Sequence, residues 1–304
     1  MTILDQAPAI STPSISASAM LAIHTCSKWT GRKKDKAASA TVTSQNYAAK
    51  GVASVSKMLL GESPALMALT KHASNARNLH YSMTLPWDDL GNRMLPSASY
   101  FRYHEVMTDM QNEFNRMVDD FLQSYTWEVS RAQARLGDLF EKNDYPSADS
   151  LRSKFAFRVD YATISDPDDF RVKIGDESAA ILKEHMNNYH NKRFDMAMDN
   201  LWKRVHTAVA NMSERLRVGE DDERVSKTGS LTFNDSLVGN VLDMVDLLGT
   251  CNVTGDSKQE AIRRQLEDTL NGVTADGLRH SSLLRAETKA SIDDIILNLP
   301  TLDL

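Results

Sequence analysis

The chain has few of the residues and segments that mark secreted or membrane-spanning proteins. Its 304 residues include only two cysteines, Cys26 and Cys251, which lie far apart and belong to no CxxC or Cys/His pattern. We therefore expect two reduced thiols, as is usual in cytosolic proteins. No apolar run approaches the roughly 20 residues that span a bilayer. The N-terminus, rich in Ser, Thr, Ala and Pro, lacks the basic and apolar regions of a secretory signal. The sequence thus predicts a cytoplasmic protein without a membrane segment.

The sequence also lacks the common catalytic and phosphate-binding motifs. It contains no GxSxG, no GxxxxGK[ST] and no GxGxxG. His185 and His190 are five residues apart, whereas the histidines of a helical zinc motif are four apart. The pairs of neighbouring carboxylates diverge by about 100° if they lie on a helix, so they do not converge on one substrate atom. We expect no catalytic, cofactor or metal site and no enzyme. An unrecognised active site would require a buried, converging set of polar groups in a pocket.

Glycine and proline are scarce, with 13 and 8 residues against 14 methionines, which favours a mainly helical fold. Two long amphipathic stretches, roughly 102–142 and 176–217, have apolar residues at steps of three or four. The first stripe comprises Val106, Met110, Phe114, Met117, Phe121, Tyr125, Val129, Leu136 and Phe140. The second comprises Ile181, Leu182, His185, Met186, Tyr189, Phe194, Ala197, Leu201, Val205, Val209, Met212 and Leu216. Forty residues of helix reach about 60 Å. We expect the two helices to run out and back as a coiled-coil-like hairpin.

The segment between the two stretches changes to a period of two. Residues 155–161 and 170–174 alternate apolar and polar side chains, and Ser165-Asp166-Pro167-Asp168-Asp169 has the composition of a turn. This pattern predicts a two-stranded β-hairpin at the tip of the helical hairpin, at about 151–175.

The remaining segments predict a helical base. We expect a loose tail at 1–18, and a base formed by 19–101 and 219–304, with the hairpin occupying 102–218. A first helix is expected at Ala19–Trp29. The prolines of 85–96 exclude a regular helix there, yet the segment carries four large apolar side chains, so we expect a loop that packs against the core.

One local feature suggests nucleic-acid binding. Lys28-Trp29-Thr30-Gly31-Arg32-Lys33-Lys34-Asp35-Lys36 places five cations and one anion beside an indole. Cations can bind phosphates and an indole can stack on a base. The alternative is a solvated turn between helices. The net charge of −6 opposes DNA binding, so we expect any such binding to be weak and salt-sensitive.

Three segments together resemble a known family. They are Thr84-Leu85-Pro86-Trp87-Asp88-Asp89 with Arg93-Met94-Leu95-Pro96, Leu136-Gly137-Asp138-Leu139-Phe140 through to Asp169-Phe170-Arg171-Val172, and Phe233-Asn234-Asp235-Ser236-Leu237 through to Asn252-Val253. The chain is similar over most of residues 20–270 to the phage and mobile-element family catalogued as domain of unknown function 3150. The resemblance implies a gene carried by phages or integrative elements. Its relatives often lie near genes for MoxR-type AAA+ ATPases, von Willebrand A-like proteins and recombination proteins.

Together these observations predict a non-enzymatic interaction protein in a phage-infected or element-carrying bacterium. We expect it to form a homo-oligomer or to act as an adaptor to a MoxR-type AAA+ ATPase or a von Willebrand A-like protein. The expected contact residues are Trp87, Asp88, Asp89, Asp166, Asp168, Asp169, Phe170 and Arg171. The alternative is a DNA-binding accessory protein in phage recombination or host takeover, which would use Lys28, Trp29, Arg32, Lys33, Lys34 and Lys36.

Overall fold

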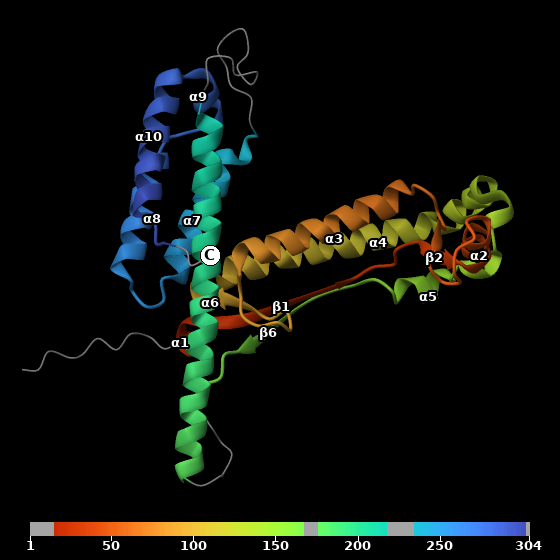
Figure 1. Cartoon of the computed structure of the whole chain (residues 1–304), viewed down its shortest axis with the longest axis horizontal. Helices are drawn as coiled ribbons and strands as arrows, with labels where there is room; N and C mark the ends of the chain where they lie inside the picture. Colours follow the sequence, from red (N-terminus) through yellow and green to blue (C-terminus); the bar gives the residue numbers. More distant parts are fainter. Residues whose placement is uncertain (1–14, 167–175, 218–233, 302–304) are drawn as a thin grey trace, which may run out of the picture. The chain divides into compact units, whose positions relative to one another are not determined.

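The structure, a computed structural model, describes residues 15–166, 176–217 and 234–301, which are mainly helical (Figure 1). The helices are α1 (Ile15–Ser18), α2 (Lys36–Gln45), α3 (Pro64–Met83), α4 (Tyr100–Leu136), α5 (Ala148–Arg152), α6 (Asp176–Leu216), α7 (Ser236–Cys251), α8 (Ser257–Leu270), α9 (Ala275–His280) and α10 (Ser282–Asn298). The strands are β1 (Ala19–Ser27), β2 (Arg32–Asp35), β3 (Val55–Met58), β4 (Leu85–Pro86), β5 (Arg93–Pro96) and β6 (Ala156–Thr163). Three short 3-10 helices are η1 (Ser97–Ser99), η2 (Gly137–Leu139) and η3 (Lys142–Asp144).

The chain divides into two compact units, and each unit is assembled from separate parts of the sequence. Unit 1 comprises residues 1–23, 82–101 and 161–304, and unit 2 comprises residues 24–81 and 102–160. This division cuts across the segments expected from the sequence, because residues 102–218 were expected to stay together. Each unit instead contains segments that pack against one another, even where they are far apart in the sequence.

The two units differ in charge. Unit 2 contains 17 Lys and Arg against 13 Asp and Glu, whereas unit 1 contains 18 against 28. Their formal charges are therefore +4 and −10, so the value of −6 for the whole chain hides a basic unit. The expectation that net charge opposes nucleic-acid binding does not apply to unit 2 taken by itself.

Unit 1 is built around the second half of α6. Its buried residues there are Ala197, Leu201, Val205, Val209, Met212 and Leu216, all of which belong to the stripe predicted from the sequence. They pack against α7 and α10, and α8 packs against both of these helices. Asp256 with Gln259 three residues on resembles a capping box, a sequence pattern that predicts a helix start. Asp256 caps α8 there by accepting hydrogen bonds from the N–H groups of Lys258 and Gln259.

The segment 85–96 packs into unit 1 as the sequence predicts, and it forms a small hairpin. Leu85 and Met94 are fully buried, and β4 pairs with β5 antiparallel through Leu85↔Met94. From α6, the guanidinium of Arg204 donates to the carbonyls of Ser82 and Thr84 at 2.5 and 3.1 Å. The strands of this sheet follow the order β4-β5-β1-β6. The hairpin is therefore fixed to α6 at its base.

Unit 2 is organised by the antiparallel pair α3 and α4. His80 Nδ1 lies 2.7 Å from the Tyr103 hydroxyl, and Ser63 donates to Glu128 at 3.2 Å, so opposite ends of the helices meet (Figure 1). The buried residues of α4 are Tyr103, Met107, Phe114, Val118, Phe121, Tyr125, Glu128 and Ala132. Their spacing of three, four or seven is that of a coiled-coil seam, and it runs along almost the whole helix.

The helix expected at Ala19–Trp29 is wrong, because these residues form strand β1 up to Ser27. The pairing Ala19↔Pro96 to Ala22↔Arg93 gives the backbone an antiparallel partner. Ala, Met and Leu favour a helix by themselves, but a strand partner distant in sequence overrides local propensity.

The expected hairpin of the two long helices is not confirmed. Residues 102–136 of α4 belong to unit 2, where α4 packs on α3, and α6 belongs to unit 1. The first strand of the expected β-hairpin is present as β6, and it lies next to β1 in the sheet order. The second expected strand, 170–174, lies outside the described residues, as do residues 1–14 of the expected tail. Periodicity thus predicted both long helices, but α4 ends at Leu136, and only Phe114, Phe121 and Tyr125 of its predicted stripe are buried. Periodicity carried no information about the partners of the two helices.

Candidate functional site

The loop after β4 contains three of the predicted contact residues, and two of them have structural roles. Trp87 is only 5% exposed and belongs to the core of unit 1. The carboxylate of Asp88 accepts hydrogen bonds from the N–H groups of Leu90 and Asn92 and from the Asn92 side chain, at 2.9, 3.1 and 2.6 Å. This arrangement closes the turn, as Asp does in many loops. The indole of Trp87 is therefore mainly covered by its own chain, and its contact with a partner stays a prediction.

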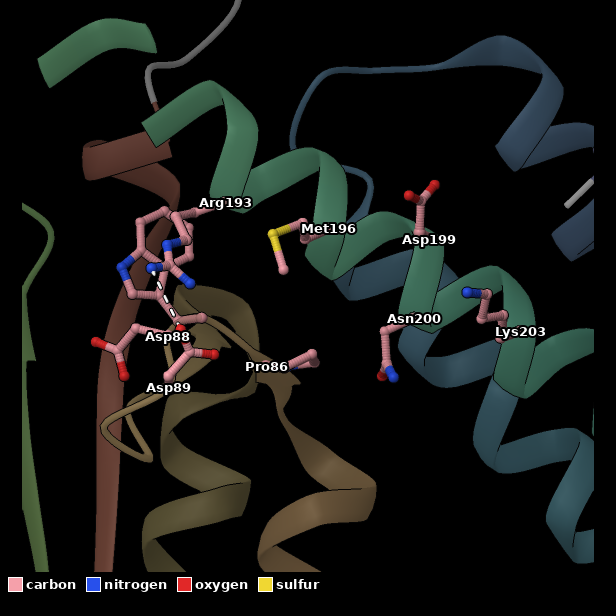
Figure 2. Close-up of a pocket in the computed structure, with 9 residues that line it drawn as sticks. Pro86, Asp88, Asp89, Arg193, Met196, Asp199, Asn200 and Lys203 are labelled. Carbon is pink, nitrogen blue, oxygen red and sulfur yellow. Dashed lines mark ion pairs between the residues drawn. The ribbon is translucent and has the colours of Figure 1, made fainter. Parts of the chain in front are cut away.

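A cleft of about 280 Å³ lies between this loop and α6 (Figure 2). The loop contributes Pro86, Trp87, Asp88 and Asp89, and α6 contributes Arg193, Met196, Asp199, Asn200 and Lys203. Asp89 is the exposed acid of the loop, with its side chain 97% exposed and 4.0 Å from the Arg193 guanidinium. The rim thus carries both signs of charge above an apolar floor. Such a cleft can receive an amphipathic side chain of another molecule.

The first half of α6 continues from this cleft, and the described residues cover it only in part. None of residues 178–196 is buried. Ile181 is 65% exposed and Tyr189 is 45% exposed, and Leu182 and Met186 are only partly covered. The Arg193 guanidinium lies 5.1 Å from the centre of the Tyr189 ring and so connects the apolar residues to the cleft. We call Ile181, Leu182, Met186 and Tyr189 the α6 patch.

Burial also affects a histidine at this end of α6. The ring of His190 lies 6.0 Å from that of Trp87, and burial lowers the pKa of His190, although Asp166 opposes this shift. Asp166 itself, another predicted contact residue, is exposed and accepts a hydrogen bond from the Ser16 hydroxyl at 3.2 Å. The predicted residues Asp168, Asp169, Phe170 and Arg171 lie outside the described residues.

The basic cluster predicted from the sequence is part of a larger structure in unit 2. Strands β2 and β3 pair antiparallel, and α2 lies in the segment that connects them. We call residues 28–58 the basic lobe, because they contain seven Lys and Arg against one Asp. Lys28 and Arg32 line a groove of about 490 Å³ together with Lys71, and Lys34, Lys36 and Lys50 line a second groove of about 600 Å³.

The indole of the basic cluster does not have the role that the sequence suggested. Trp29 is 9% exposed and packs against Phe121 and Tyr125, with ring centres 6.3 and 6.0 Å apart. It therefore anchors the lobe to α4 and cannot stack on a base, which corrects the expectation. The sequence alone could not reveal this, because an indole beside cations looks the same whether its ring faces inward or outward.

Two of the seven cations are neutralised within the fold. Lys33 and Lys57 each lie 2.6 Å from the carboxylate of Asp144, and Lys57 also lies 3.8 Å from Asp35. Burial raises the pKa of Asp144, but the hydrogen bonds from the two lysines outweigh it and hold the pKa below its usual range. Within the described part of the chain, Lys28, Arg32, Lys34, Lys36 and Lys50 make no ion pair. These five charges are free to meet an external anion.

Two buried polar atoms of unit 2 have no hydrogen-bond partner among the described residues. They are the Nε2 atom of His24 and one carboxylate oxygen of Glu128. His24 lies against the rings of His80 and Phe157, and burial lowers its pKa, with a smaller contribution from Arg77. In the described ranges no group of three or more His, Cys, Asp or Glu is placed to hold a metal ion. No helix in those ranges is long and apolar enough to cross a membrane.

A scan of protein-family models, a search of curated proteins and a search of solved structures found no match to this chain. The resemblance to the phage family therefore stays a prediction, and the candidate functions rest on the geometry of the cleft, the α6 patch and the basic lobe.

Proposed function

We propose that the protein works by binding other protein chains through the α6 patch and the adjoining cleft, and that its first partner is a second copy of itself. The observation that carries this proposal is the partly covered first half of α6. An isolated helix is marginal in water and gains most of its stability by burying one face. Ile181, Leu182, Met186 and Tyr189 form such a face, yet the described residues of this chain do not bury it.

A second copy fits the mixed charge of this surface. In a twofold interface the same patch meets itself, so it must be self-complementary. The cleft is lined by the carboxylates of Asp88, Asp89 and Asp199 and by the cations of Arg193 and Lys203. The Asp88 carboxylate is hydrogen-bonded within its own loop, so two carboxylates and two cations face outward. Two copies related by a twofold axis can therefore pair these signs while their apolar residues cover one another. A partner of one sign only would leave half of the rim unmatched.

The same surface is also our proposed site for a MoxR-type AAA+ ATPase or a von Willebrand A-like protein. This part of the proposal rests on the resemblance alone. It makes the protein an adaptor in a phage or mobile element, in addition to an oligomer. An ATPase that engages the α6 patch would compete with self-association, so adding it would change the oligomeric state.

The experiment measures the molar mass of the purified chain by light scattering across a hundredfold range of concentration. The double variant Ile181→Ser/Tyr189→Ser should shift the mass towards that of the monomer. Removing two exposed apolar side chains from each copy should weaken a dimer by about 2–4 kcal/mol, or roughly 30- to 1000-fold in Kd. At concentrations where the wild type is monomeric, the variant should have the same melting temperature as the wild type, because neither residue is buried.

The matched control is Leu283→Ser/Leu297→Ser on α10, which removes two side chains that are 69% and 83% exposed elsewhere in unit 1. It should leave the mass unchanged. A wild-type chain that is monomeric at every concentration, and that also fails to bind the ATPase, would end the proposal. Equal effects of the two double variants would show that general surface hydrophobicity, and not the α6 patch, drives association.

A further inference from the structure

Tyr47 has an unusual place at the end of α2. The N–H of Tyr47 donates to the Ser44 carbonyl at 3.1 Å, and the N–H of Ala48 donates to the Thr43 carbonyl at 3.0 Å. These two bonds form the helix-terminating motif in which the residue after the cap adopts a left-handed conformation. Tyr47 occupies that position with φ +50°, and it is the one residue other than glycine with a positive φ in the described ranges.

Folding does not explain a tyrosine at this position. Glycine is usual there, and at the corresponding end of α8 the chain has Gly272 with φ +72°. A bulky side chain is strained in the left-handed region. Burial would offset such strain, but Tyr47 is 99% exposed. A strained and fully exposed aromatic residue points to a role outside the fold.

The surroundings of Tyr47 indicate what that role is. The groove of about 600 Å³ runs beside α2 and the loop that follows it, and it is lined by Ser44 and Ala48, the neighbours of Tyr47 on either side. Lys34, Lys36 and Lys50 line the same groove, and none of them makes an ion pair with the described residues. Small side chains such as Ala40 and Ala53 leave the groove wide. Free cations beside an exposed ring are the usual components of a single-strand binding surface.

We propose that the basic lobe binds single-stranded nucleic acid, with Tyr47 stacking on a base and Lys34, Lys36 and Lys50 contacting the backbone phosphates. Stacking requires a base whose face is exposed, which a duplex provides only at its ends. A single strand therefore uses both the ring and the cations, whereas a duplex would use the cations alone. This site is separate in sequence from the α6 patch, so the proposal stands independently of the proposed function.

The experiment measures fluorescence anisotropy of a dye-labelled oligo(dT) of about 15 nucleotides, titrated with the full-length chain at several salt concentrations. Binding should weaken as salt rises, with a slope of about −0.7 in log K against log salt for each phosphate contact. Three lysines predict a slope of about −2. A duplex of the same length should bind more weakly than the single strand.

The substitution Tyr47→Gly separates binding from folding, because the two should change in opposite directions. Glycine relieves the strain, so the melting temperature should rise by a few degrees. Loss of the stacked ring should weaken oligo(dT) binding about 5- to 100-fold. Tyr47→Phe keeps the ring and should retain both the affinity and the melting temperature of the wild type.

The double variant Lys34→Gln/Lys50→Gln tests the phosphate contacts. It should reduce the salt slope by about 1.4 and weaken binding at low salt. Its control, Lys192→Gln/Lys258→Gln, changes the net charge equally through two exposed lysines of unit 1. It should bind like the wild type, because those lysines lie outside the basic lobe.

Three results would overturn the proposal. The first is a Tyr47→Gly variant with wild-type affinity, which would show that the Tyr47 ring does not contribute to binding. The second is equal binding of single strand and duplex, which would leave only a general attraction to phosphate. The third is binding to vesicles containing phosphatidylserine but not to oligo(dT), which would make the lobe a membrane-surface site instead.

Discussion

The two long helices of this protein carry similar sequence signals and are used differently. The seam of α4 is buried from Tyr103 to Ala132, so nearly the whole helix serves the fold of unit 2. Among the described residues, the seam of α6 is buried only from Ala197 onward, and its first half is only partly covered. An amphipathic pattern therefore predicts that one face of a helix will be buried, but it does not predict which chain buries that face. The difference between the two helices is the main reason to look for a partner at the start of α6.

The largest expected effect comes from breaking the buried seam of α4. Phe121 is fully buried, and its ring contacts those of Trp29, Tyr125 and Phe155. Phe121→Ala should lower the free energy of unfolding by about 3–5 kcal/mol, because it removes apolar contacts and leaves a cavity. Chemical denaturation followed by circular dichroism measures this loss. A change below about 1 kcal/mol would show that α4 is not packed as described.

A smaller effect is expected at Asp144, which forms ion pairs with two lysines in the segment after α4. Asp144→Asn should lower the free energy of unfolding near pH 7 by about 2 kcal/mol, because Lys33 and Lys57 lose their shared carboxylate. The pKa of Asp144 is held below its usual range, so its contribution is present above the unfolded pKa of about 4. This contribution to the free energy of unfolding is lost as the pH falls through the lower pKa that Asp144 has in the folded protein. The difference between wild type and variant should therefore shrink in acid, and a difference independent of pH would contradict the ion pair.

The smallest effect is expected at the partly covered first half of α6. Tyr189→Ala should change the free energy of unfolding by less than about 0.5 kcal/mol at concentrations where the chain is monomeric. Leu201→Ala, three turns along the same helix and fully buried, should cost about 2–5 kcal/mol. Denaturation curves of the two variants compare the halves of one helix directly. Similar losses would mean that the first half is packed after all, and the α6 patch would not exist.

The sequence was most informative where local chemistry decides the structure. The bounds of α6 and the cap of α8 at Asp256 follow from periodicity and from a side chain that binds the first free N–H groups. The packing of Leu85 and Met94 follows from apolar residues between prolines. Each of these features depends on residues close together in the chain.

The sequence was least informative where segments far apart in the chain determine the structure. Strand β1 depends on its pairing with β5, which is about 75 residues away, and α4 depends on α3 instead of on α6. Trp29 and Trp87 drew attention as contact residues because large aromatic side chains serve in cores and at interfaces alike. Tyr47 was missed because nothing in the letters 44–50 indicates a left-handed residue or an exposed ring.

The interleaving of the two units has a consequence for how the chain folds during its synthesis. The ribosome completes unit 2 at residue 160, when every segment of that unit has been made. The hairpin of β4 and β5, by contrast, has already been made but must wait for α6, α7 and α10 to supply its core. Leu85 and Met94 remain uncovered during that interval, which is the kind of exposure that chaperones recognise. The order of translation thus completes unit 2 first and leaves the early segments of unit 1 exposed while the rest of that unit is being made.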